Sequence, residues 1–230
     1  MTLLRSPSHS KPPQNIVLVL DAMGVIFSVG DDVADLLVPF IHERNGESDR
    51  QKIELLYREA SLGRVSAGDF WQAVGLDPTV EDDYLDRHRL TPGALDFLRA
   101  PPPDVSAIWC LSNDVSEWSR KLRDRFSLAT YIRGFVVSGD VGARKPDAAI
   151  FHRLFANIAA ETNHAILVDD RSQNLDVARS LGMGTIQFSA GVFAQAARHC
   201  AAADFQELRK LLSSGDRTPW ISPPFAPFRG

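Results

Sequence analysis

Acidic residues follow two short apolar runs of this chain, and a lysine comes shortly after a third. Asp21 directly follows the run NIVLVL, and Asp169 and Asp170 follow the run AILV. Lys145 comes seven residues after the run GFVVS. Carboxylates that lie close together repel one another, and Mg²⁺ is a hard cation that such oxygen ligands hold. A neighbouring lysine would neutralise negative charge that grows in a transition state. The pattern therefore predicts a Mg²⁺ site that acts on an anionic molecule.

The elements that must position these side chains are strands alternating with helices. Helical patterns cover residues 146–160 and 173–181. Strand-like apolar runs span residues 15–20, 106–111, 134–138, 165–168 and 184–188. Continuous apolar strands that alternate with helices indicate a parallel sheet covered on both faces. We therefore expect an α/β, Rossmann-like core of three layers, with a mostly parallel sheet and the polar residues gathered at the carboxyl ends of its strands.

One long segment interrupts this alternation. Residues 30–90 have helical patterns and no strand-like run, which predicts a small helical cap inserted after the first strand. The predicted core then comprises residues 15–29 and 91–212. Residues 1–14 and 213–230 are expected to be tails, the first without the apolar stretch of a signal peptide. The second carries three aromatic residues that could dock on the body or on a second subunit: Trp220, Phe225 and Phe228.

Composition excludes several classes of function. The chain has 230 residues, 44% hydrophobic residues and a net charge of −4, with no basic block, which argues against nucleic-acid binding. No apolar stretch is long enough to span a membrane. Two cysteines, Cys110 and Cys200, are typical of thiols in a reducing compartment, with a single disulfide as the alternative. We expect a cytoplasmic monomer or homodimer whose partner is a small anionic molecule.

Four short segments carry a family resemblance that covers residues 15–212. They are residues 21–25 (DAMGV), 111–113 (LSN), 144–146 (RKP) and 168–174 (VDDRSQN). In this order they resemble the four motifs of the haloacid dehalogenase-like (HAD) hydrolases. Residues 57–76, with GRVS and FW, resemble the small helical cap of the phosphoglycolate phosphatase-like branch. Each motif alone is weak, but four at successive strand ends, with a cap in the expected gap, are specific.

The resemblance implies a role for each matching position. Asp21 matches the nucleophile, which forms a covalent intermediate and also binds the metal. Ser112, followed by Asn113, matches the hydroxyl that bonds the transferring group, and Lys145 matches the lysine that stabilises its charge. The implied Mg²⁺ ligands are Asp21, the backbone carbonyl of Met23, Asp169 and Asp170, with Asn174 supporting the metal shell.

One position departs from the family pattern. Phosphatases of the family have a second Asp two residues after the nucleophile, and Met23 stands there in this chain. A thioether transfers no proton, so a contribution of ~10²–10⁴-fold from general acid–base catalysis is missing. Members that cleave carbon–halogen or carbon–phosphorus bonds also lack that Asp, but the dehalogenases generally work without Mg²⁺. The leading hypothesis is a phosphatase for a small metabolite with a good leaving group. The alternatives are a dehalogenase or other C–X hydrolase, and a catalytically silent binding protein.

Residues outside the motifs have simpler interpretations. Asp31 and Asp32 are expected to be helix N-caps, with a smaller chance that one reaches the site as a substitute acid. His42 and His88 are expected to be exposed on helices. In the predicted cap, the candidates to face the substrate are Tyr57, Arg58, Arg64 and Trp71.

Overall fold

The computed structural model describes residues 15–159, 164–189 and 199–214. The predicted first tail and the three aromatic residues of the second tail lie outside these ranges. Within them, no helix is both long enough and apolar enough to cross a bilayer.

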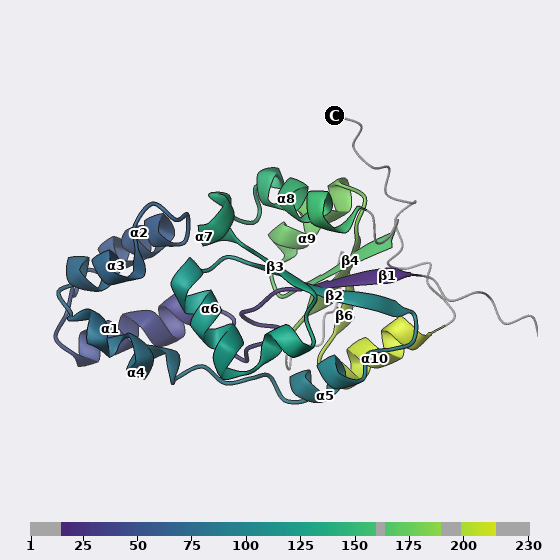
Figure 1. Cartoon of the computed structure of the whole chain (residues 1–230), viewed down its shortest axis with the longest axis horizontal. Coiled ribbons are helices and arrows are strands. Elements are labelled where there is room, and N and C mark those ends of the chain that lie inside the picture. Colours follow the sequence, from purple (N-terminus) through teal and green to yellow (C-terminus); the bar gives the residue numbers. More distant parts are fainter. Residues whose placement is uncertain (1–14, 160–163, 190–198, 215–230) are drawn as a thin grey trace, which may run out of the picture.

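The core is one parallel sheet of six strands in the order β3-β2-β1-β4-β5-β6 (Figure 1). The strands are β1 (Ile16–Leu20), β2 (Val105–Ser112), β3 (Gly134–Val137), β4 (His164–Asp169), β5 (Gly184–Phe188) and β6 (Cys200–Ala202). The predicted Rossmann-like α/β fold is confirmed, and its five predicted strands are present. The short strand β6 was not predicted, because three small residues give no apolar run.

Helices cover both faces of the sheet. Alternate residues of β1 face opposite layers, as the two-residue period of a strand requires. Val17 and Val19 pack with α8 and α9, whereas Leu18 and Leu20 pack with α5, α6 and α10. The helices outside the insert are α5 (Ala94–Arg99), α6 (Ser116–Arg125), η3 (Leu128–Thr130), α7 (Ser138–Val141), α8 (Ala148–Ile158), α9 (Ser172–Ser180) and α10 (Phe205–Ser213). The resulting layers show in Figure 1, with α8 and α9 above the sheet and α5 and α10 below it.

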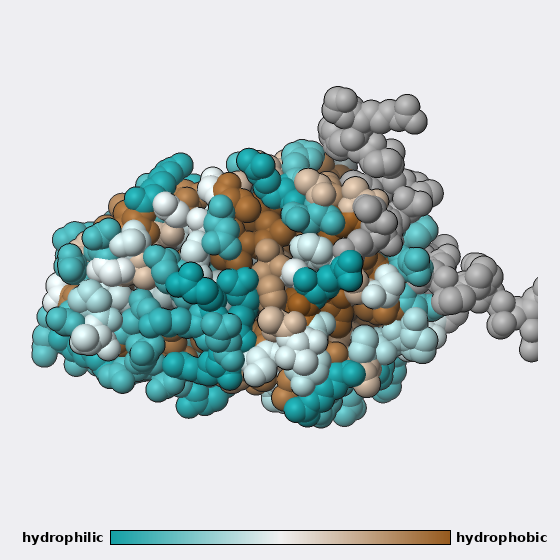
Figure 2. Space-filling view, in the orientation of Figure 1, coloured by the Kyte–Doolittle hydropathy of each residue, from teal (hydrophilic) through white to brown (hydrophobic). Residues whose placement is uncertain are grey.

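The segment between β1 and α5 is helical, as predicted, and we call its helices the insert. They are the π-helical η1 (Val33–Leu37), α1 (Val38–Glu43), α2 (Arg50–Ala60), α3 (Ala67–Ala73), η2 (Pro78–Val80) and α4 (Glu81–Leu85). In Figure 1 they gather at one end of the molecule, and Figure 2 shows that mostly hydrophilic residues cover them on this face. The domain boundaries at residues 30 and 90 remain a prediction.

Buried aromatic rings join the insert to the core. The ring centroid of Trp118 in α6 lies 5.1–5.3 Å from the ring centroids of three insert residues, Phe70, Trp71 and Tyr84. Glu81 of α4 accepts hydrogen bonds from the indole of Trp71 at 3.1 Å and from the indole of Trp118 at 2.8 Å. These contacts fix the position of the insert above the carboxyl ends of the strands.

Three local expectations need correction or completion. Helix α8 begins at Ala148 rather than at Pro146, because Asp147 is its N-cap and accepts from the backbone N–H of Ala149. His88 is buried rather than exposed, and burial lowers its pKa to about 4. Cys110 and Cys200 are free thiols.

Candidate active site

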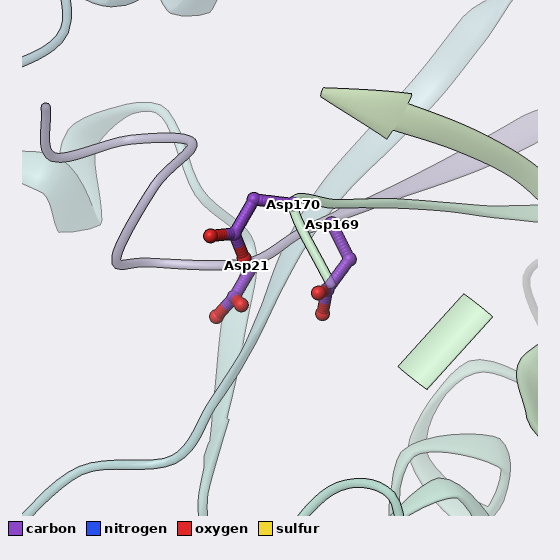
Figure 3. Close-up of side chains that lie close together, drawn as sticks. All are labelled: Asp21, Asp169 and Asp170. Atoms are coloured by element: carbon purple, nitrogen blue, oxygen red, sulfur yellow. The ribbon is translucent and has the colours of Figure 1, made fainter. Parts of the chain in front are cut away.

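Three carboxylates meet where β1 and β4 end (Figure 3). The pairing of Leu20 with Val168 brings Asp21, the residue after β1, level with Asp169, the last residue of β4. The backbone N–H of Asp21 bonds to the carbonyl of Val168 at 2.9 Å and locks this register. One oxygen from each of Asp21, Asp169 and Asp170 lies within 4.8 Å of the others. The predicted convergence of acids is therefore present.

Lys145 lies between two of these acids. Its Nζ is 2.8 Å from Oδ1 of Asp21 and 2.7 Å from Oδ2 of Asp169, and all three side chains are buried. Burial alone would lower the pKa of Lys145, but the carboxylates of Asp169 and Asp21 outweigh it and raise that pKa above its usual value. Lys145 is therefore a fixed positive charge at the site.

Asn113 positions the backbone of Lys145. Its side-chain amide donates to the carbonyl of Lys145 at 2.9 Å and accepts from the backbone N–H of Lys145 at 2.8 Å. Asn174 plays a similar part on the other side of the site, because its amide nitrogen donates to both oxygens of Asp169 at 2.9 and 3.0 Å. Ser112 ends β2 with a buried hydroxyl that has no hydrogen-bond partner among the described residues.

The ionised forms of Asp21 and Asp170 are disfavoured in the folded protein. Burial raises the pKa of Asp21 well above its usual value, and the charge of Asp169 raises it further, although Lys145 opposes both. Burial raises the pKa of Asp170 to about 6, again with a contribution from Asp169. A group of acids that resists ionisation is stabilised by a cation.

The donor set fits Mg²⁺. All its side-chain ligands would be carboxylate oxygens, which this ion prefers. Oδ1 of Asp170 is buried without a hydrogen-bond partner in the described part of the chain, so it is available to a ligand. The backbone also packs tightly against Asp170, since a Cβ at Gly24 would lie 2.6 Å from Oδ2 of that residue. Gly24 has φ +78°, so glycine is required there for conformation as well as for space.

A pocket of about 320 Å³ lies over these residues, between the insert and the core. From the core it is lined by Asp21, Met23, Asn113, Arg144, Arg171 and Asn174, and from the insert side by Gly30, Asp31, Asp32, Val33, Glu54, Tyr57 and Arg58. Three arginines thus line a space that Asp21 of the acidic cluster also lines.

The predicted cap candidates divide into two groups. Tyr57 and Arg58 line the pocket, and the hydroxyl of Tyr57 donates to the carbonyl of Asn113 at 3.2 Å. Trp71 does not line it, because this side chain is fully buried and bonded to Glu81. Arg64 instead pairs with Glu59 on the surface.

The two adjacent acids at the start of the insert also differ. Asp31 is an N-cap, as predicted, and accepts from the backbone N–H of Ala34 at 3.1 Å. Asp32 makes no capping bond but is buried at 6% exposure against the pocket. The DD doublet gives no sign of which acid points inward, so the sequence predicted capping for both and gave only a smaller chance that one of them reaches the site.

Solved structures with the same fold include a phosphatase, a dehalogenase and a further HAD family enzyme. A HAD phosphatase from Thermococcus onnurineus is 21% identical, with a TM-score of 0.65 over 86% of this chain and 97% of that chain. The HAD family enzyme bt-2542 from Bacteroides thetaiotaomicron, in complex with magnesium and inorganic phosphate, is 16% identical, with a TM-score of 0.66 over 79% and 98%. An L-2-haloacid dehalogenase from Xanthobacter autotrophicus, with chloropropionic acid covalently bound, is 16% identical, with a TM-score of 0.61 over 87% and 99%. This chain has the fold of the HAD superfamily.

Curated relatives match only in part. Flavin mononucleotide hydrolase 1 from Arabidopsis thaliana is 30% identical over 71 residues, which are 31% of this chain and 29% of that protein. Drimenol cyclase drtB from Aspergillus calidoustus is 43% identical over 51 residues, 22% of this chain and 10% of that protein. The chain therefore aligns with less than a third of either relative's length. No family model matches the chain.

Proposed function

We propose that this protein is a Mg²⁺-dependent phosphohydrolase that uses Asp21 as its nucleophile on a small phosphorylated metabolite. The observation that carries the proposal is the meeting of three carboxylates within 4.8 Å, beside a buried lysine and under a pocket. A cation would stabilise carboxylates that repel one another at such short distances. Mg²⁺ sites in proteins commonly combine carboxylates with oxygens of a substrate phosphate, which favours a phosphorylated substrate.

The residues that would hold Mg²⁺ are Asp21, Asp169, Asp170 and the backbone carbonyl of Met23. When bound, the ion screens the negative nucleophile from a negative substrate and stabilises charge on the transferring group. The partnerless oxygen of Asp170 and the all-oxygen donor set support this assignment.

The chain's own groups define the rest of the chemistry. A free oxygen of Asp21 attacks phosphorus while its Oδ1 stays within reach of Lys145, 2.8 Å away. Lys145 balances charge on the nucleophile and on the phosphoryl oxygens, and Asn113 keeps the lysine in place. The buried hydroxyl of Ser112 donates to the transferring group. Water attacking the same phosphorus then releases phosphate and regenerates Asp21.

The pocket indicates a compact anionic substrate. About 320 Å³ accommodates a small metabolite rather than a polymer. Arg58, Arg144 and Arg171 supply the positive charge that a phosphate or carboxylate requires. The insert would act as a cap that excludes water and sets specificity, chiefly through Tyr57 and Arg58. The flavin mononucleotide hydrolase relative is consistent with a phosphate-ester substrate.

One observation favours a second candidate, hydrolysis of a carbon–halogen bond. Met23 places an apolar, buried side chain beside Asp21 where the family's phosphatases have an acid. A halide leaves without protonation and would not need that acid. The acidic cluster weighs against this candidate, because a metal-free site gains nothing from three converging carboxylates.

A substrate screen separates these functions. Purified protein is assayed with dinitrophenyl phosphate and with 2-haloacids, each with Mg²⁺ and with a chelator. We expect Mg²⁺-dependent release of phosphate and no release of halide. Halide release that persists in chelator would establish the second candidate. Inactivity on every compound, in folded protein that binds Mg²⁺, would indicate a binding protein without catalysis.

A further inference from the structure

We propose that Asp32 is the catalytic acid and base of this site and performs the proton transfers that Met23 cannot perform. The inference rests on the proposed phosphohydrolase function and extends it. It assigns the missing role to a carboxylate of the insert side, eleven residues after the nucleophile in the chain.

Asp32 is in an unusual position for an acid. Its side chain is 6% exposed, and Oδ2 has no hydrogen-bond partner within the described ranges. A buried polar atom without a partner costs free energy, so such atoms are rare unless a ligand or a function explains them. The pocket that Asp32 lines is the one that Asp21 and Met23 also line. A substrate held there is therefore enclosed by walls to which both the nucleophile and Asp32 belong.

The local backbone explains why Asp32 is free to face the pocket. Asp31 takes the capping role, because its Oδ1 accepts from the N–H of Ala34. Asp32 itself has helical dihedrals, φ −59° and ψ −30°, and precedes the π-helical segment η1. Short π-helical turns often occur at functional sites. Asp31 thus caps the helix, and Asp32, which makes no capping bond, turns inward.

The charges around Asp32 come from several elements. Arg144, before α8, and Arg171, after β4, attract its carboxylate, while Asp31 repels it. Asp114, after β2, is a second buried acid, and the charge of Asp32 contributes to raising its pKa. Tyr57 and Tyr84 are the neutral hydroxyls near Asp32. Burial is the largest effect on Asp32 and raises its pKa to about 6. A group with a pKa near the working pH both donates and accepts protons effectively.

The reaction balances with Asp32 in both roles. In the first step the Asp21 oxygen–phosphorus bond forms and the phosphorus–leaving-oxygen bond breaks, and the proton of neutral Asp32 passes to the leaving oxygen. In the second step the Asp32 carboxylate takes a proton from water as the water oxygen attacks phosphorus. The bond from phosphorus to Asp21 then breaks, phosphate leaves, and Asp32 is again protonated. The net reaction consumes one phosphate ester and one water and yields one alcohol and one phosphate.

The test compares leaving groups in Asp32→Asn and in a matched control. Asp35→Asn makes the same change on η1, at an exposed residue that does not line the pocket. Release of the leaving group is measured in a single turnover, with excess protein and Mg²⁺, on dinitrophenyl, nitrophenyl, phenyl and alkyl phosphates, and folding is checked by thermal melting. Asp32→Asn should lower this single-turnover rate for phenyl and alkyl phosphates by up to ~10²–10⁴-fold, and for dinitrophenyl phosphate by only a few-fold, because hydrolysis of the Asp21 intermediate does not enter it. Asp35→Asn should leave all four rates unchanged.

Other patterns would overturn the proposal. An equal loss on every leaving group, or no loss at all, would show that Asp32 is structural. If wild-type protein cleaves none of the four esters, the proposed function has failed and this inference fails with it. If wild-type protein is active and the Asp32→Asn profile stays parallel to it, only the inference has failed.

A second variant tests directly whether Asp32 performs the proton transfers of the acid that Met23 replaces. Met23→Asp restores the family's acid beside the nucleophile. In wild-type protein the gain on alkyl phosphates should be small, because Asp32 already transfers the proton. In the Asp32→Asn background the same change should recover much of the lost rate. An equal gain in both backgrounds would contradict the role of Asp32.

Discussion

The ammonium group of Lys145 lies 2.8 Å from Oδ1 of Asp21, and the 2.7 Å contact of the same group with Asp169 makes it a bridge between two strand ends. Both carboxylates are buried, and little solvent is present to screen them from each other. The lysine is therefore as important for the stability of the metal-free site as for its chemistry.

Lys145→Met should destabilise the metal-free protein. Removing one member of a buried ionic cluster leaves the other charges uncompensated, at a cost of ~3–5 kcal/mol. Urea unfolding in chelator measures the loss. Adding Asp21→Asn to this variant should recover part of it, because one of the two repelling acids is gone. Strictly additive losses in the double variant would show that Lys145 and Asp21 are not coupled.

Asp170→Asn should remove or greatly weaken Mg²⁺ binding. Oδ1 of Asp170 has no hydrogen-bond partner among the described residues, so the change should affect metal binding more than the fold. Calorimetric titration of Mg²⁺ into wild type and variant measures the effect. Asp147→Asn is the control, because Asp147 is an exposed cap of α8 that does not belong to the acidic cluster, and asparagine caps equally well. Equal affinities in all three proteins would eliminate the proposed Mg²⁺ site.

Asp32 makes stability depend on pH. Its folded-state pKa, about 6, is raised above the usual 3.8, so ionisation is disfavoured in the folded protein and stability falls as pH rises from about 4 through 6. Asp32→Asn should therefore gain stability relative to wild type between pH 4 and pH 8, by at most ~2–3 kcal/mol. Chemical unfolding of metal-free protein at the two pH values tests this, with Asp35→Asn as the control. A difference that does not change with pH would show that Asp32 ionises normally.

Glu81 should anchor the insert to the core. Glu81→Ala leaves the buried indole N–H groups of Trp71 and Trp118 without their acceptor, which we expect to cost ~2–5 kcal/mol. Asp83→Ala, on the same helix but exposed and paired with Arg44 on the surface, should cost less than ~1 kcal/mol. Urea unfolding gives both values. Similar losses for the two variants would mean that the indole bonds do not hold the insert.

The sequence predicted the sheet and the acidic cluster because both depend on local patterns. Apolar runs mark buried strands, and parallel strands bring their carboxyl ends to one edge, so Asp21, Lys145 and Asp169 could be placed together without coordinates. Their catalytic and metal-binding roles remain predictions.

The details that the sequence missed depend on tertiary packing. Trp71 can be buried because Glu81, ten residues later, accepts the hydrogen bond from its indole N–H. His88 is buried against the rings of Phe27 and Tyr84. A helical pattern in the sequence does not predict which residues will contact Trp71 and His88 in the folded protein. Asp31 and Asp32 are chemically identical neighbours, and only the path of the chain into η1 decides which one caps and which one faces the pocket.

The central claim is that Asp21 forms a covalent bond to phosphorus. It is tested most directly by mixing excess protein with dinitrophenyl phosphate and Mg²⁺, stopping the reaction in acid within one turnover, and mapping the peptides by mass spectrometry. We expect a peptide that carries one phosphoryl group on Asp21, and we expect it to be absent in Asp21→Asn and in chelator. Turnover that continues in Asp21→Asn at the wild-type rate, with no phosphorylated peptide in either protein, would contradict it.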